Sequence, residues 1–287
     1  MVPNVLVTFP GKIGDALMQW PCAYFYWKET GNKFTVLLDQ SISCLKNLFT
    51  FQECVKEVLI LDRMENWRCG GQPYDFALTK EEKSKWDNIY HMGFRQLPEK
   101  QLTLQAAENI PIKSDREEFS KQSIFVGDRK LKSALIVHGS AGTHHGIHAK
   151  PRVWDVFGVC EGFFRKAFDE IIFVGNKEDS DTKDTLGYEG TFLDDGGDLL
   201  PTAAIMNGAE FVLGAGSCMV ALAGTLGIPS LRIHDPLWGA EDYRLWGFLG
   251  KQHGNYYPKG AILKNEVLKF VEEQCRSRWG AKLTVSS

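Results

Sequence analysis

A carboxylate near the start of the chain stands where it could remove a proton from a substrate. Residues 5–9 form an apolar, β-branched run, and apolar residues at helical spacing follow from residue 14 to about residue 28. The turn between them holds Gly11 and Gly14, and Asp15 comes next. This order predicts a strand, a tight turn and a helix. Open α/β sheets bind ligands at the carboxyl ends of their strands, so Asp15 is a candidate general base. The alternative is a structural role, in which Asp15 only satisfies free amide groups of the helix.

A second set of candidate residues lies in the other half of the chain. A predicted strand at 133–138 precedes a loop rich in glycine and histidine, and Lys150 and Arg152 follow ahead of a helix. Cationic side chains there could hold a diphosphate, and an arginine could do so with two hydrogen bonds. The loop adds the hydroxyl groups of Ser140 and Thr143. A solvated basic pair is the structural alternative.

A third candidate is a glycine-rich turn. Gly214, Gly216 and Ser217 follow one predicted strand and precede a predicted helix. Amide groups at a helix N-terminus favour an anion, which predicts contact with phosphate. The same segment partly matches the dinucleotide fingerprint, with Asp235 placed for a ribose, but Met219 occupies the third glycine position. A nicotinamide-dependent oxidoreductase is therefore a further alternative.

Two patterns could be interpreted as metal sites. The first is a group of four histidines: His138, His144, His145 and His148. Their spacing fits no familiar zinc pattern, and contact of a loop histidine with phosphate is the better interpretation. The second is Asp179-Ser180-Asp181, which opens a predicted helix, so capping at the surface explains it better. We predict no metal site.

Composition excludes several classes of protein. The 287 residues, 44% hydrophobic and 24% charged, can bury one large core or two medium ones. A net charge of −3 gives no general attraction to nucleic acid. No apolar stretch approaches the roughly 20 residues that span a bilayer, and the N-terminus lacks the features of a signal peptide. Seven cysteines without C-x-x-C spacing favour reduced, mostly buried thiols, so we expect a cytoplasmic protein.

The predicted elements form two consecutive α/β halves. Strands are expected at 5–9, 34–38, 58–61, 74–78, 133–138, 170–175, 211–214 and 230–233, and helices at 14–28, 154–166, 221–226 and 267–276. Each half opens with a strand and a glycine loop, and the alternation predicts parallel sheets. We therefore expect an α/β fold with two Rossmann-like domains, 1–130 and 131–264, facing each other across a cleft. A C-terminal helix at about 265–280 could pack back on the first domain. The aromatic residues of the first helix are expected to pack in the core.

Three segments carry a resemblance to a known family. They are residues 10–17 with Pro21, residues 138–142 with 150–154, and residues 210–229. In order and spacing they resemble glycosyltransferase family 9, the heptosyltransferase family. The resemblance implies the two-domain GT-B fold and metal-independent transfer of a sugar, with inversion, from a nucleotide-diphosphate donor to a glycan or lipid-linked glycan. It implies no cofactor, and ADP-heptose is the family's best-known donor.

The resemblance also assigns roles to single residues. It makes Asp15 the base and Lys150 a ligand of the donor phosphates, and it implies contact of Lys12 and Gly14 with acceptor or phosphate. It matches Glu178 to an acid that contacts the donor ribose, although an acid in the first turn of a helix is also favoured by the helix dipole alone. The expected partners are a nucleotide sugar and a glycan acceptor, without nucleic acid. A lipid-linked acceptor would add peripheral contact with the inner membrane.

The late motif departs from the family. Where the family has Asp-Thr-Gly and then His, this chain has Gly216, Ser217, Cys218 and Ala221. An acid and an imidazole expected near the nucleotide sugar are absent, so the donor sugar and the nucleotide base stay open. A catalytically silent protein that binds nucleotide sugars is therefore the main alternative to an enzyme. The acceptor and the oligomeric state are not indicated by the sequence.

Overall fold

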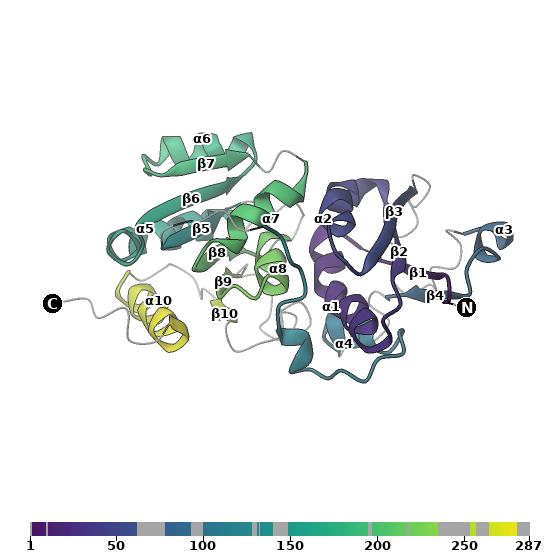
Figure 1. Ribbon diagram of the computed structural model, residues 1–287. Helices are drawn as coiled ribbons and strands as arrows, with labels where there is room; N and C mark the ends of the chain where they lie inside the picture. Colours follow the sequence, from purple (N-terminus) through teal and green to yellow (C-terminus); the bar gives the residue numbers. More distant parts are fainter. Residues whose placement is uncertain are drawn as a thin grey trace.

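The computed structural model contains two parallel β-sheets in consecutive halves of the chain (Figure 1). The structure describes residues 2–9, 11–61, 78–92, 100–127, 131, 133–139, 149–194, 197–216, 218–234, 253–256 and 264–279. The predicted domain boundary at 130/131 falls at a gap in this description and stays a prediction. None of the described helices is long and apolar enough to cross a membrane.

The N-terminal half is built on a four-stranded sheet of order β3-β2-β1-β4, with every pairing parallel. Its strands are β1 (Val5–Thr8), β2 (Phe34–Asp39), β3 (Val55–Leu61) and β4 (Asn88–His91). Its helices are α1 (Ile13–Thr30), η1 (Gln40–Leu45), α2 (Lys46–Thr50), α3 (Lys80–Lys83), α4 (Leu102–Ala107) and η4 (Glu118–Ser120). The sequence analysis expects no strand where β4 lies, and this was wrong, because a partly exposed edge strand carries little apolar pattern. Most of the candidate strand at 74–78 lies outside the described residues.

The C-terminal half is built on a six-stranded parallel sheet of order β10-β9-β8-β5-β6-β7. Its strands are β5 (Ala134–His138), β6 (Glu170–Gly175), β7 (Thr191–Asp194), β8 (Phe211–Ala215), β9 (Ser230–Ile233) and β10 (His253–Tyr256). Its helices are α5 (Ala149–Ala167), α6 (Lys177–Thr185), α7 (Leu199–Asn207), α8 (Cys218–Thr225) and α10 (Lys264–Trp279). Four strands of this sheet match the prediction, and β7 and β10 were missed.

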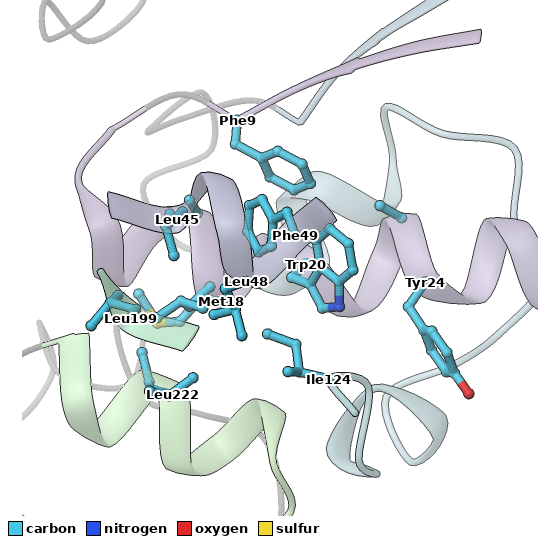
Figure 2. Close-up of a cluster of buried hydrophobic side chains, with 14 of the residues drawn as sticks. Phe9, Met18, Trp20, Tyr24, Leu45, Leu48, Phe49, Ile124, Leu199 and Leu222 are labelled. Atoms are coloured by element: carbon cyan, nitrogen blue, oxygen red, sulfur yellow. The ribbon is translucent and has the colours of Figure 1, made fainter. Parts of the chain in front are cut away.

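One apolar cluster joins the two halves. Helix α1 packs on α8, and α2 packs on α7. Figure 2 shows Met18 of α1 beside Leu199 of α7 and Leu222 of α8, and all three are buried. Two peptide groups strengthen the junction, because Ser123 and Ile124 donate backbone hydrogen bonds to the carbonyl oxygen of Thr225 at 2.8 and 3.0 Å. The halves therefore share a continuous core.

The aromatic residues of α1 pack in this core, as predicted. Trp20 is fully buried and stacks on Phe49 with 4.3 Å between ring centroids. Its indole N–H donates to the carbonyl oxygen of Ser123 at 2.8 Å. Tyr24 is buried and Trp27 is half-buried. These rings fix α1 on its sheet and hold the first turn of the helix in place.

The C-terminal helix lies in the second half of the molecule (Figure 1). Its chief helix contact is α5, and Val267, Val271 and Cys275 are buried in the cluster on that face of the six-stranded sheet. The spacing of these three residues gives α10 one apolar stripe, which α5 and the sheet cover. The described residues of α10 therefore pack on the C-terminal half, and the prediction that this helix could pack back on the first domain was wrong.

The cysteines that the structure describes are free thiols. Cys22, Cys54, Cys160 and Cys275 are buried, as the sequence predicts. Burial raises the pKa of Cys54 and of Cys160 to about 12, so neither thiol ionises near neutral pH.

Candidate active site

Asp15 is held over the turn between β1 and α1. Its Oδ2 accepts a hydrogen bond from the backbone N–H of Lys12 at 2.7 Å. Gly11 has a φ of +97°, and a Cβ on it would lie 2.6 Å from the same oxygen, so a glycine is needed for the carboxylate to fold back here. Asp15 and Gly14 are half-buried, whereas Lys12 is exposed. Asp15 thus caps its helix and keeps access to solvent, so capping and catalysis are compatible.

The same arrangement occurs at the start of α6. Asp179 Oδ2 accepts the backbone N–H of Asn176 at 3.1 Å, and Asn176 Oδ1 accepts the N–H of Asp179 at 3.2 Å. Asp179 is fully buried, so its predicted capping role is confirmed but its predicted surface position was wrong. Glu178, the candidate ribose ligand, is exposed at the second residue of α6. Its role stays a prediction.

The two glycines of the late turn have separate surroundings. Gly214 is buried in β8, and a Cβ on it would lie 2.9 Å from Val220 Cγ2, so glycine here lets α8 approach the strand. Gly216 is exposed after β8, and a Cβ on it would lie 2.7 Å from Arg232 Nη2. The contact of either glycine with phosphate stays a prediction. Arg232 is a residue that the sequence analysis missed.

A buried histidine lies two residues after Arg232, just beyond the end of β9. His234 is 1% exposed, and its Nε2 lies 2.7 Å from Asn255 Oδ1 on the neighbouring stretch of β10. Burial lowers the pKa of His234 to about 3, and the positive charge of Arg232 acts in the same direction. The imidazole is therefore neutral near pH 7. Since Asn255 Oδ1 only accepts, we assign the proton to Nε2.

Several candidates are only partly described or lie outside the description. Lys150 and Arg152 belong to the first turn of α5, which begins at Ala149 rather than at the predicted 154. Their side chains are outside the described atoms. The remaining residues outside the description are Ser140, Thr143, His144, His145, His148, Ser217 and Asp235. Among the residues that are described, no group of three His, Cys, Asp or Glu side chains could hold a metal ion.

The topology brings the C-terminal candidates to one edge. His138, Gly214 and Arg232 are register partners on β5, β8 and β9, so the segments after these strands leave the sheet side by side. The helix starts of α5, α6 and α8 follow the carboxyl ends of β5, β6 and β8. This is the edge at which open α/β sheets bind ligands.

Helix α1 belongs to the N-terminal half, and its first turn lies near the apolar cluster that joins the two halves. Asp15 precedes Met18 by about 4.5 Å along α1, and Cys218 precedes Leu222 by about 6 Å along α8. Met18 and Leu222 lie together in the shared cluster (Figure 2). The first turns of α1 and α8 are therefore both within about two helical turns of the junction.

A separate pocket lies at the other end of α1. It has a volume of about 430 Å³ and is lined by Tyr24, Trp27, Lys28, Phe51, Gln52, Glu53, Cys54, Phe125 and Val126. Asp15 precedes the first of these residues by nine positions, or about 13 Å along the helix. The pocket is thus distinct from the candidate active site.

Comparison with solved structures identifies the fold. The glycosyltransferase family 9 protein of Veillonella parvula superposes with a TM-score of 0.67 at 12% identity, over 96% of this chain and 97% of that one. Heptosyltransferase II of E. coli gives 0.65 at 10% identity, over 96% and 99%. The E. coli heptosyltransferase WaaC with ADP gives 0.62 at 14% identity, over 94% and 99%. The chain therefore has the GT-B fold of these glycosyltransferases, as its sequence predicts.

No family model matches the sequence, and no curated protein matches it.

Proposed function

We propose that this protein is an inverting glycosyltransferase that moves a sugar from a nucleotide-diphosphate donor to a glycan or lipid-linked glycan. The observation that carries the proposal is the placement of Asp15, a half-buried carboxylate at the carboxyl end of β1 and near the junction of the two halves. The fold shared with family 9 glycosyltransferases supports it. ADP-heptose is the first donor to test, because WaaC and TibC have been solved with ADP-heptose or an analogue of it.

The proposed reaction needs one base and a site for the leaving group. Asp15 accepts the proton of the acceptor hydroxyl as that oxygen bonds to the anomeric carbon of the sugar. The bond from this carbon to the diphosphate breaks, and the diphosphate leaves with the electron pair. Attack from the face opposite the diphosphate inverts the configuration. A positioned base of this kind contributes about 10²–10⁴-fold to the rate.

Lys150 and the turn around Gly216 are the proposed donor site. Lys150 lies in the first turn of α5, and Gly216 lies between β8 and α8. Cationic side chains and helix amide groups at this edge would stabilise the departing diphosphate without a metal. TibC, a structural relative with a TM-score of 0.52, is an iron-containing glycosyltransferase, so the proposed independence of metal needs its own test. Turnover that survives chelation supports it, and turnover lost on chelation and restored by a metal refutes it.

A donor screen tests the proposed function. Thermal unfolding is measured with ADP-, UDP-, GDP- and dTDP-sugars, and a ligand at 100 times its Kd stabilises the protein by about 2.7 kcal/mol. Donors that bind are then incubated with glycan acceptors, and release of the nucleoside diphosphate is followed. Acceptor-dependent release establishes the transferase. The absence of binding by every nucleotide sugar contradicts the proposal.

The second candidate function is binding of a nucleotide sugar without turnover. The observation that favours it is the glycine at position 216, where the family resemblance leads one to expect an acid. Donor binding without product across the whole acceptor panel identifies this function. A lipid-linked acceptor, presented in vesicles, belongs in that panel because the proposed enzyme would then work in the cytoplasm against the inner membrane.

A further inference from the structure

A row of polar side chains lies on one face of the six-stranded sheet. Along β9, Leu231 and Ile233 face the apolar cluster that contains α5 and α10. The alternating residues Ser230, Arg232 and His234 therefore face the opposite side, where α8 packs. A polar strand face in a core is costly unless its groups are hydrogen-bonded or serve a function.

Two of these three residues have structural partners on β10. Ser230 Oγ lies 2.8 Å from His253 Nδ1, and His234 Nε2 lies 2.7 Å from Asn255 Oδ1. Both pairs tie β9 to β10 inside the sheet. Arg232, between them in the strand, extends the other way, because its guanidinium lies against Gly216 at the end of β8.

The position of the guanidinium is set by glycine. Gly214 is the register partner of Arg232 on β8, and Gly216 lies two residues further along on the same face. A Cβ on Gly216 would stand 2.7 Å from Nη2 and 2.9 Å from Nε of Arg232. Gly216 is exposed, whereas Arg232 is half-buried and its Nε is buried, so the guanidinium lies beside the exposed turn just ahead of α8.

The guanidinium of Arg232 brings a positive charge to this edge of the sheet. His234 is neutral near pH 7, so it adds no positive charge of its own. An acid at position 216 would stand against the guanidinium, whereas the glycine there adds no charge. The edge where the donor is proposed to bind thus gains a cation at the place where the family resemblance leads one to expect a carboxylate.

We propose that Arg232 binds an oxyanion of the nucleotide-sugar donor. This inference rests on the proposed function. The planar guanidinium presents paired N–H donors that match the oxygens of a phosphate or a carboxylate. The oxyanion has two sources, the diphosphate of every donor or the carboxylate of an acidic sugar. On the diphosphate, Arg232 stabilises the leaving group, and on a carboxylate, it selects the sugar.

The experiment measures binding by calorimetry for the full chain and for Arg232→Gln. The ligands are ADP, UDP, GDP and dTDP, the corresponding neutral nucleotide sugars, a nucleotide uronic acid, and inorganic pyrophosphate. A hydrogen bond to a charged group contributes enough that its loss weakens binding about 10- to 100-fold. Arg232→Lys keeps the charge but not the paired donors, so its affinity lies between that of the unaltered protein and that of Arg232→Gln. Arg276→Gln, which removes an exposed cation on α10, is the matched control and leaves affinity unchanged.

A second set of variants addresses the same charge from position 216. Gly216→Asp places a carboxylate against the guanidinium and weakens binding as Arg232→Gln does. Gly216→Ala adds the same Cβ without charge and has the smaller effect. Circular dichroism and thermal unfolding confirm that each variant is folded.

The pattern of losses decides the outcome. Weaker binding of nucleoside diphosphates and of every nucleotide sugar assigns Arg232 to the diphosphate. Weaker binding of the uronic acid alone assigns it to a sugar carboxylate. If the unaltered protein binds nucleotide sugars and Arg232→Gln binds all of them equally well, the inference fails and the proposed function stands. If no nucleotide binds, the proposed function fails, and pyrophosphate then tests Arg232 by itself.

Discussion

The starts of α1 and α6 share one local design but differ in exposure. In each, a glycine lies just ahead of the helix and an aspartate four residues later, Asp15 or Asp179, accepts the backbone N–H of the residue after that glycine. A Cβ on either glycine, Gly11 or Gly175, would lie within 2.6 Å of the aspartate oxygen. Asp179 is fully buried, whereas Asp15 is half-buried.

The comparison shows that a capping contact does not identify a catalytic acid. Asn176 returns a side-chain hydrogen bond to Asp179, which completes a capping box in the interior. At the other helix the corresponding residue is Lys12, whose ammonium has no acceptor to offer. Solvent access, rather than the shared backbone contact, separates a candidate base from a structural carboxylate.

The largest expected effect is on turnover in Asp15→Asn. An amide keeps an oxygen for the Lys12 N–H but cannot take a proton, so kcat falls about 10²–10⁴-fold while donor affinity changes little. The free energy of unfolding changes by less than about 1 kcal/mol. Initial rates and thermal unfolding measure the two quantities. Asp179→Asn makes the same chemical change at the equivalent position, and equal loss of activity in both would erase the distinction.

The next effect is on stability in Asp179→Ala. Removal of the buried carboxylate leaves the Asn176 N–H without its acceptor and costs about 1–3 kcal/mol of unfolding free energy. Urea unfolding measures it, with Asp181→Ala on the exposed side of α6 as the control. A cost below 0.5 kcal/mol would show that the buried cap contributes little.

Alanine at the two glycines sharpens the comparison further. Gly11→Ala forces a strained φ and displaces the Asp15 carboxylate, so we expect about a tenfold loss in kcat/KM and about 1–2 kcal/mol in stability. Gly175→Ala displaces Asp179 and lowers stability alone. Steady-state kinetics and urea unfolding of the pair test this. Loss of turnover in Gly175→Ala with normal turnover in Gly11→Ala would reverse the assignment.

The smallest expected effect is the pH dependence that His234 adds to the free energy of unfolding. The pKa of His234 is about 3 in the folded protein, against 6.5 ordinarily. Unfolding therefore takes up a proton below pH 6.5, and stability falls as the pH drops from 6.5 toward 3. The loss is about 1 kcal/mol between pH 6.5 and 5.5. His234→Gln lacks this contribution, so its urea unfolding should depend less on pH across that interval. If the free energy of unfolding depends on pH equally in the unaltered protein and in His234→Gln, the prediction is contradicted.

The sequence predicts the strand–turn–helix units and the position of Asp15 because both depend on short-range spacing. Arg232 could not be found in this way. Alternation along β9 shows that Ser230, Arg232 and His234 share a face, but the partner across that face, Gly216, depends on the pairing of β8 with β9. The buried position of Asp179 likewise depends on packing rather than on the spacing of its acids.

The shared cluster of Met18, Leu199 and Leu222 also constrains motion. Large apolar interfaces resist relative movement of the parts that they join. Rotating one sheet away from the other would expose these side chains to water, and the stabilisation from their burial would be lost. The spacing between Asp15, the proposed proton acceptor, on one half and Arg232 on the other is thus set when the polypeptide folds, before any ligand binds.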